Sequence, residues 1–321
     1  SSNTLLQNFF AGRGSQWGLS ISGNHNDILQ STATSPGSSA VSLSVGGSSN
    51  TVVGGYSYGA GALISGSYNT IDQSTMTSDL ADRSALEIDG SYNTLTWNYI
   101  SNPLGDGLDL YQADHNTVDQ SVMTGGGTSA LYSFGLFIAG SSNTITNSLI
   151  RGTTGVYVIG STGTVIASSV ITATNTAGNG LWMLGGSLNL SLSSNTITGG
   201  AQGAGVYLDA YNSGAINLSS NTISGGRYGV NIAAQNAGAA LVITSMTFSS
   251  LTAGATAINF LGGQFVSTFT GAAFDSANIS VNVNGSQLSP GSRITMANAS
   301  GQRAGAAYEN DTGGYVDWAD V

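Results

Sequence analysis

Apolar residues recur along the chain in pairs that lie two positions apart, as at positions 86 and 88, 108 and 110, and 206 and 208. Side chains with this spacing point to the same face of a β-strand, so each pair indicates a short strand with one buried face. Two further short apolar segments follow most pairs, as in Thr94-Leu95 and Tyr99-Ile100. The pattern therefore predicts three short strands in each repeat, and it contains no sustained helical stripe.

A polar motif repeats with the same period. The sequence Gly-Ser-Tyr-Asn-Thr-Ile at 66–71 returns in closely related form at 90–95 and 140–145. Shorter copies share an asparagine followed by threonine, and we expect these asparagines to form a structural ladder: Asn50, Asn69, Asn93, Asn116, Asn143, Asn195 and Asn221. An asparagine tolerates the left-handed backbone of a sharp corner, and stacked amides can hydrogen-bond from one turn to the next.

A repeat of roughly 20 to 30 residues is typical of a solenoid, in which each turn buries its apolar face against its neighbours. The sequence therefore predicts an all-β fold, a single-stranded parallel β-helix of about 11–12 rungs over residues 1–285. The repeat stops near Asn284, and residues 286–321 are expected to form a C-terminal cap or a linker.

These turns resemble the right-handed parallel β-helix repeat of the pectate-lyase-like superfamily, and the resemblance covers about residues 1–285. It implies a right-handed coil and an extracytoplasmic protein that is carbohydrate-directed or part of a surface adhesin. The same scaffold serves lyases, hydrolases, epimerases and inert adhesive stalks, so the resemblance specifies the fold rather than the activity.

Composition narrows the choice of partners. Charged residues make up 7% of the chain, against a typical value of about 25%, and the formal net charge is −10 with no lysine. We therefore expect no binding to nucleic acid or to anionic membrane surfaces. No cysteine is present, which excludes disulfides and thiolate metal sites, and no apolar run is long enough to span a membrane.

The surface predicted from this composition is rich in Ser, Thr, Asn and Gly, as suits an extracellular or cell-surface protein. The chain begins inside the repeat pattern at Ser2-Asn3-Thr4. We interpret it as a secreted piece that is processed or excised from a longer precursor.

Where flanking aliphatic residues point inward, the residue between them points outward. Glu87 and Asp109 occupy this position on adjacent turns, with Asp89 two residues after Glu87 and Asp106 at the start of the second turn. Carboxylates about 5 Å apart are candidates for the acid and nucleophile of a retaining glycosidase. The oxygens of Glu87, Asp89 and Asp109 are alternatively candidate Ca²⁺ ligands, and a solvated acidic face is the third interpretation.

The same outward column becomes aromatic further along the chain. Its four candidate ligand-binding residues are Phe137, Tyr157, Trp182 and Tyr207. An exposed aromatic strip suits a sugar ring or a partner chain, whereas a covering loop would make the strip part of the interior. His25 and His115 each precede a corner asparagine and are expected to be corner residues.

Two functions fit these observations. The first is a non-enzymatic structural or adhesive module of a surface fibre, sheath or adhesin, which self-associates through the open edges of its solenoid. The alternative is a carbohydrate-binding or carbohydrate-active protein, a polysaccharide hydrolase or lyase, that uses Glu87, Asp109 and the aromatic strip.

Overall fold

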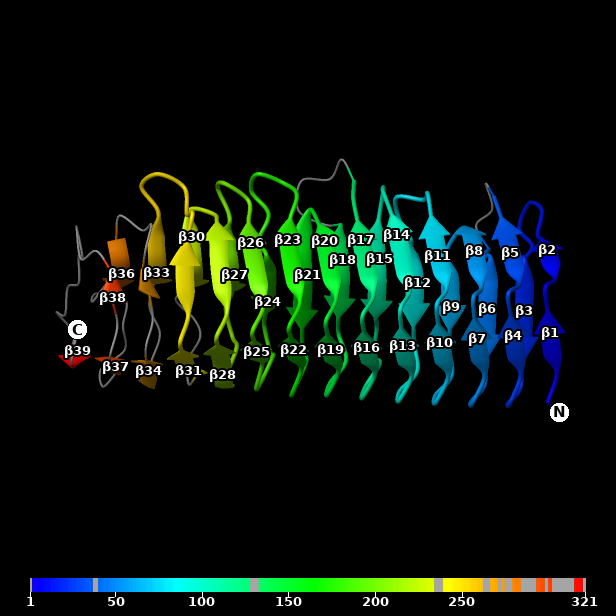
Figure 1. Ribbon diagram of the computed structural model, residues 1–321, viewed down its shortest axis with the longest axis horizontal. Helices are drawn as coiled ribbons and strands as arrows, with labels where there is room; N and C mark the ends of the chain where they lie inside the picture. The colour runs from blue at the N-terminus through cyan, green and yellow to red at the C-terminus, as the bar shows by residue number, and fades with distance from the viewer. Residues whose placement is uncertain are drawn as a thin grey trace. The chain divides into compact units, whose positions relative to one another are not determined.

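The computed structural model describes residues 2–36, 40–127, 133–233 and 239–261, and after these only strands up to residue 319. The regular secondary structure of these residues consists of β-strands, and the strands pair in parallel (Figure 1). Each turn of chain supplies one strand to each of three sheets, here called A, B and C in chain order. The predicted all-β parallel β-helix is confirmed.

The chain divides into two compact units, Ser1–Thr153 and Thr154–Val321. In the first unit sheet A contains β1 (Thr4–Leu6), β4 (Asp27–Leu29), β7 (Thr51–Val53), β10 (Thr70–Asp72), β13 (Thr94–Thr96), β16 (Thr117–Asp119) and β19 (Thr144–Thr146). Sheet B contains β2 (Phe9–Ala11), β5 (Thr32–Ser35), β8 (Tyr56–Gly59), β11 (Thr75–Ser78), β14 (Tyr99–Asn102), β17 (Val122–Gly125) and β20 (Leu149–Gly152). Sheet C contains β3 (Leu19–Ser22), β6 (Leu43–Gly46), β9 (Ala62–Ile64), β12 (Ser84–Ile88), β15 (Asp106–Leu110) and β18 (Phe134–Ile138).

The second unit repeats this arrangement. Its sheet A strands are β22 (Val165–Ala167), β25 (Ser191–Ser193), β28 (Gly214–Ser219), β31 (Ala239–Thr244), β34 (Val266–Thr270), β37 (Arg293–Ala297) and β39 (Tyr315–Ala319). Its sheet B strands are β23 (Val170–Ala173), β26 (Thr196–Gly199), β29 (Thr222–Gly225), β32 (Thr247–Ser249), β35 (Ala273–Phe274) and β38 (Ser300–Gly301). Its sheet C strands are β21 (Thr154–Ile159), β24 (Leu181–Leu184), β27 (Ala204–Leu208), β30 (Tyr228–Ile232), β33 (Thr256–Phe260) and β36 (Ile279–Val283).

The core forms where the apolar pairs of successive turns stack. Leu86 pairs with Leu108 and Ile88 with Leu110 across β12 and β15, and all four side chains are fully buried. The residue between each pair points outward, as the alternation predicts for a strand with one buried face. Sheet C contains six strands in each unit, so its twelve described strands agree with the predicted number of turns.

An asparagine ladder precedes the sheet A strands of the first unit. The backbone N–H and the side-chain amide of Asn50 both donate to Oδ1 of Asn69, at 2.8 and 3.0 Å. Asn69 makes the same two bonds to Asn93, and Asn116 makes them to Asn143. These asparagines are buried, so the bonds satisfy backbone and side-chain groups that water does not reach.

The prediction of one common ladder is wrong for Asn195 and Asn221. These two residues precede β26 and β29, which belong to sheet B, and Asn195 donates to Oδ1 of Asn221 at 2.9 and 3.0 Å. In the second unit the buried residue directly before β25 is Leu190, and the equivalent position one turn later is the buried Ile216, which lies inside β28. The asparagine ladder of the second unit therefore lies before sheet B instead of sheet A, although the local sequence around its asparagines is the same.

The backbone role expected of the ladder asparagines belongs instead to the residue before them. Tyr68, Tyr92 and His115 have φ values of 59°, 60° and 56°. The corner thus separates two tasks, since one residue adopts the left-handed conformation and the following asparagine makes the bonds between turns. His25, with φ of 59°, and His115 are corner residues, as predicted.

Parallel pairing extends past residue 285. β37 pairs with β34 and then with β39, inside the segment that was expected to be a cap or linker. The remainder of residues 286–321 lies outside the described residues. Among the described residues, no helix is long and apolar enough to cross a membrane.

Candidate functional site

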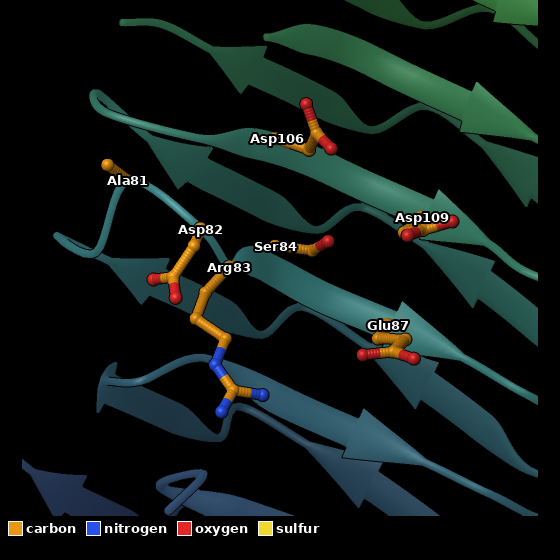
Figure 2. Close-up of a pocket in the computed structure, with 7 residues that line it drawn as sticks. All are labelled: Ala81, Asp82, Arg83, Ser84, Glu87, Asp106 and Asp109. Atoms are coloured by element: carbon orange, nitrogen blue, oxygen red, sulfur yellow. The ribbon is translucent and has the colours of Figure 1, made fainter. Parts of the chain in front are cut away.

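A polar cavity opens on the outer face of sheet C in the first unit. Its volume is about 310 Å³, and Figure 2 shows the seven residues that line it: Ala81, Asp82, Arg83, Ser84, Glu87, Asp106 and Asp109. The first three precede β12, and the others lie on β12 and β15. Two neighbouring turns therefore build the cavity, because each turn supplies one strand to the sheet.

Strand register places the carboxyl groups in this cavity side by side. Glu87 on β12 pairs with Asp109 on β15, and Ser84 pairs with Asp106. Figure 2 shows the side chains of Glu87 and Asp109 on adjacent strands, with Asp106 nearer the start of β15. The two candidate catalytic residues chosen from the sequence are thus brought together.

Asp109 has the most perturbed environment of these carboxyl groups. Burial raises the pKa of Asp109 to about 8, with further contributions from the negative charges of Glu87, Asp106 and Asp89. A hydrogen bond from the Ser84 hydroxyl opposes this rise. Oδ1 of Asp109 is inaccessible to solvent and has no hydrogen-bond partner among the described residues. Asp109 is therefore protonated at neutral pH and can donate a proton.

Asp106 and Glu87 differ from Asp109 in their partners. Burial raises the pKa of Asp106 to about 6, while the backbone N–H of Phe134, which donates to Oδ1 at 2.7 Å, lowers it. Burial and then the charge of Asp89 raise the pKa of Glu87, and Arg83 opposes this rise. Burial thus raises the pKa of three of the four carboxyl groups that line the cavity, to about 8 at Asp109 and to about 6 at Asp106.

Neighbouring carboxyl groups whose pKa values are separated by their surroundings are typical of acid–base sites. The proton of Asp109 is available to a leaving group, and an ionised neighbour is available to a water molecule or to a sugar carbon. The sequence places Asp106 beside the acidic pair without giving it a role, and it does not single out the hydroxyl of Ser84. The signal that could have found Ser84 is its position at the start of β12, in register with Asp106.

The calcium prediction for Glu87, Asp89 and Asp109 gains no support from geometry. Across the described ranges, no three acidic or histidine side chains are grouped so that they could hold a metal ion. Asp89 is exposed and follows the end of β12, whereas Glu87 and Asp109 lie within strands.

The four aromatic candidates fall into two groups. Phe137 on β18 pairs with Asp109, so it borders the acidic residues of the first unit, and its ring centroid lies 6.0 Å from that of Phe134. Tyr157, Trp182 and Tyr207 lie on β21, β24 and β27 of the second unit and pair in register. All four side chains are half-buried on the outer face of sheet C.

A carboxylate that the sequence did not single out, that of Asp209, lies beside the aromatic residues of the second unit. Nε1 of Trp182 donates to Oδ2 of Asp209 at 3.3 Å, and the backbone N–H of Ala210 donates to Oδ1 at 2.7 Å. Asp209 directly follows β27, so strand register brings it beside the neighbouring tryptophan.

The three parallel sheets, each of which receives one strand per turn, define a right-handed β-helix protein. The family model described as a right handed beta helix region matches residues 134–300, which is 167 of 321 residues and more than half of the chain. The chain belongs to this family. A comparison with curated proteins gives no match.

Solved structures share the fold at low sequence identity. The catalytic unit of a GH87 alpha-1,3-glucanase from Streptomyces thermodiastaticus is 15% identical with a TM-score of 0.61, over 99% of this chain and 62% of that one. A polygalacturonase from Erwinia carotovora is 10% identical with a TM-score of 0.55, over 98% and 96%. The tailspike of E. coli bacteriophage HK620, solved with a pentasaccharide, is 11% identical with a TM-score of 0.57, over 92% and 60%. At these identities the likeness establishes the fold alone.

Proposed function

We propose that this protein is carbohydrate-active and hydrolyses a glycosidic bond of a neutral polysaccharide at the cavity of Glu87, Asp106 and Asp109. The observation that carries the proposal is the in-register pair of Glu87 and Asp109, in which Asp109 keeps its proton at neutral pH. Glycoside hydrolysis needs one carboxylic acid to protonate the leaving oxygen and one carboxylate that attacks the sugar carbon or activates a water molecule.

Asp109 is the proposed general acid, because its pKa of about 8 keeps the proton available at neutral pH. Glu87 is the proposed partner carboxylate, since it lies on the neighbouring strand at the same level. Asp106 is held by the backbone of Phe134 and adds negative charge that helps Asp109 retain its proton. This charge also disfavours an anionic sugar at the cavity, as does the net charge of −10.

The names of the similar structures support the choice of carbohydrate. They include a glucanase, a polygalacturonase and a tailspike solved with a pentasaccharide. The chain spans about three fifths of the glucanase unit and of the tailspike, so a comparable activity is a proposal for this chain.

The test is release of reducing sugar from a panel of neutral glucans, mannans and galactans. Wild-type protein should release reducing ends, Asp109→Asn and Glu87→Gln should not, and Asp27→Asn on sheet A serves as the matched control. The anomeric form of the first product, read by NMR, reports whether the pair works with retention or inversion. Binding without turnover by the wild type would reduce the proposal to a carbohydrate-binding protein.

A non-enzymatic structural or adhesive role is the second candidate. The buried asparagine ladder and the low charge content favour it, because they suit a stiff, weakly charged module of an extracellular surface assembly. In this proposal the protein is secreted and self-associates. Light scattering across a hundredfold range of protein concentration tests it, and a constant monomer mass would count against it.

A further inference from the structure

Three aromatic side chains and one carboxylate gather on the outer face of sheet C in the second unit. Tyr157, Trp182 and Tyr207 stand in register on consecutive strands. Each lies between two buried aliphatic residues, as Trp182 does between Leu181 and Met183. The strands therefore direct all three rings away from the core, and their half-buried state leaves part of each ring in solvent.

The arrangement of these rings differs from that of the other aromatic column in the chain. At the corner of the first unit, Tyr68 and Tyr92 are stacked at 5.0 Å and 5°, and Tyr92 and His115 at 4.7 Å and 15°. Those rings cover each other's faces, so the column offers mainly ring edges to a ligand.

In the second unit the three rings are not all stacked face to face. Tyr157 and Trp182 meet edge to face, with centroids 5.0 Å apart and an interplanar angle of 66°. Trp182 and Tyr207 are stacked more loosely, with centroids 6.2 Å apart and an interplanar angle of 29°. Tyr157 and Trp182 thus meet without parallel faces, and each of the three rings is half-buried, so part of the ring surface faces solvent on the outer side of the sheet.

Asp209 supplies a fixed hydrogen-bond acceptor beside these rings. Its Oδ2 accepts from Nε1 of Trp182 at 3.3 Å, and its Oδ1 accepts from the N–H of Ala210 at 2.7 Å. The pKa of Tyr207 is raised by burial and by the charge and hydrogen bond of Asp209, so this carboxylate also contacts the tyrosine hydroxyl. A carboxylate has about four acceptor positions, which leaves capacity for a ligand hydroxyl.

We propose that Tyr157, Trp182, Tyr207 and Asp209 form a binding site for a neutral hexose unit of a glycan, separate from the cavity of Glu87, Asp106 and Asp109. A hexose has C–H faces that pack on aromatic rings and hydroxyl groups that donate to a carboxylate. The charge of Asp209 and the net charge of −10 select against uronic acids and other anionic sugars. The site goes beyond the proposed hydrolysis, because it requires no carboxyl group of the cavity.

Isothermal titration calorimetry of the full chain with maltohexaose, laminarihexaose, cellohexaose and mannohexaose tests the site. At least one neutral hexasaccharide should bind with a millimolar or lower Kd, and Trp182→Ala should weaken binding at least tenfold. Asp209→Asn should weaken it about three- to tenfold, because the amide keeps one acceptor oxygen and loses the charge. Tyr99→Ala, which removes an outward aromatic residue from sheet B, is the matched control and should leave Kd unchanged.

Several outcomes would overturn the site. These are no binding of any neutral hexasaccharide by the wild type, equal binding by Trp182→Ala, or tighter binding of hexagalacturonate. A heat signal that follows protein concentration in the absence of sugar would indicate that a second copy of the chain occupies the rings. Circular dichroism establishes that Trp182→Ala is folded, and Trp182→Phe, which keeps a ring but loses the Nε1 donor, should bind with intermediate affinity.

The failure of this site and the failure of the proposed hydrolysis are distinguishable. Asp109→Asn should abolish turnover and leave the Kd for the hexasaccharide unchanged. Trp182→Ala should raise this Kd and leave the turnover of a short soluble substrate unchanged. Loss of both properties in both variants would contradict a separate site.

Discussion

Asp109 lies in register with Glu87 on the next strand of sheet C, so two carboxyl groups meet on one face of the sheet at successive turns. The charge of Glu87 adds to the effect of burial and raises the pKa of Asp109 to about 8. A parallel solenoid produces this contact directly, because residues at equivalent positions of successive turns are separated by the strand spacing of about 4.8 Å.

The first prediction concerns stability against pH. The pKa of Asp109 is about 8 in the folded protein, while an unfolded aspartate has a pKa of about 3.9, so the folded state binds this proton more tightly. The resulting stabilisation is fully present below about pH 4 and is lost as the pH rises to about 8. Asp109→Asn should therefore be more stable than wild type at pH 9, by roughly 5 kcal/mol for a shift of about four pKa units, and close to wild type at pH 4.

Urea denaturation of both proteins at pH 4, 6.5 and 9 measures this difference. Asn24→Ala, which changes no titratable group, is the control and should show the wild-type dependence on pH. A difference between Asp109→Asn and wild type that stays constant from pH 4 to pH 9 would show that Asp109 ionises normally.

The second prediction concerns activity. If Asp109 protonates the leaving group, Asp109→Asn should lower kcat by about 10²- to 10⁴-fold, the usual contribution of a positioned acid. Wild-type activity should fall above about pH 8, where Asp109 loses its proton. Initial rates of reducing-sugar release from pH 5 to pH 10 measure both effects. A kcat for Asp109→Asn within threefold of wild type would remove Asp109 from the mechanism.

The periodic part of the fold was predictable from the sequence. Outward positions such as those of Glu87 and Asp109 were assigned correctly, because a strand with one buried face alternates strictly and the period aligns successive turns. The fold class followed from the same regularity, since the apolar pairs recur in both units.

The corners were less predictable. Asn143 and Asn195 have the same local sequence, Ser-Asn-Thr-Ile, but they stand before sheet A and before sheet B respectively. The ladder partner of Asn195 is Asn221, 26 positions further along the chain, so the corner is set by contacts between turns that the local sequence does not contain. The pKa values of Asp109 and Asp106 also could not be predicted from the sequence. Both depend on burial, and that of Asp106 depends in addition on the backbone N–H of Phe134.

The third prediction concerns the ladder. Asn69→Ala removes the acceptor of two bonds from Asn50 and the donor of bonds to Asn93 and to the Gly47 carbonyl. Leaving buried polar groups without partners costs about 1–3 kcal/mol each, so the free energy of unfolding should fall by at least about 2 kcal/mol. Asn24→Ala removes one exposed bond and should cost less than about 0.5 kcal/mol. Equal losses for the two variants in urea denaturation would contradict the role of the ladder.

The fourth prediction concerns the stack of Tyr68 on Tyr92. Both residues have positive φ, which a tyrosine rarely adopts, so Tyr68→Asn and Tyr92→Asn each relieve backbone strain while removing ring contacts. The two effects oppose each other in the single variants, and only the double-mutant cycle isolates the contribution of the ring pair. We expect a coupling free energy of about 0.5–1.5 kcal/mol that favours the stacked pair. The four proteins of the cycle are compared by urea denaturation at pH 7, and additivity within about 0.3 kcal/mol would mean that the two exposed rings stack without stabilising the corner.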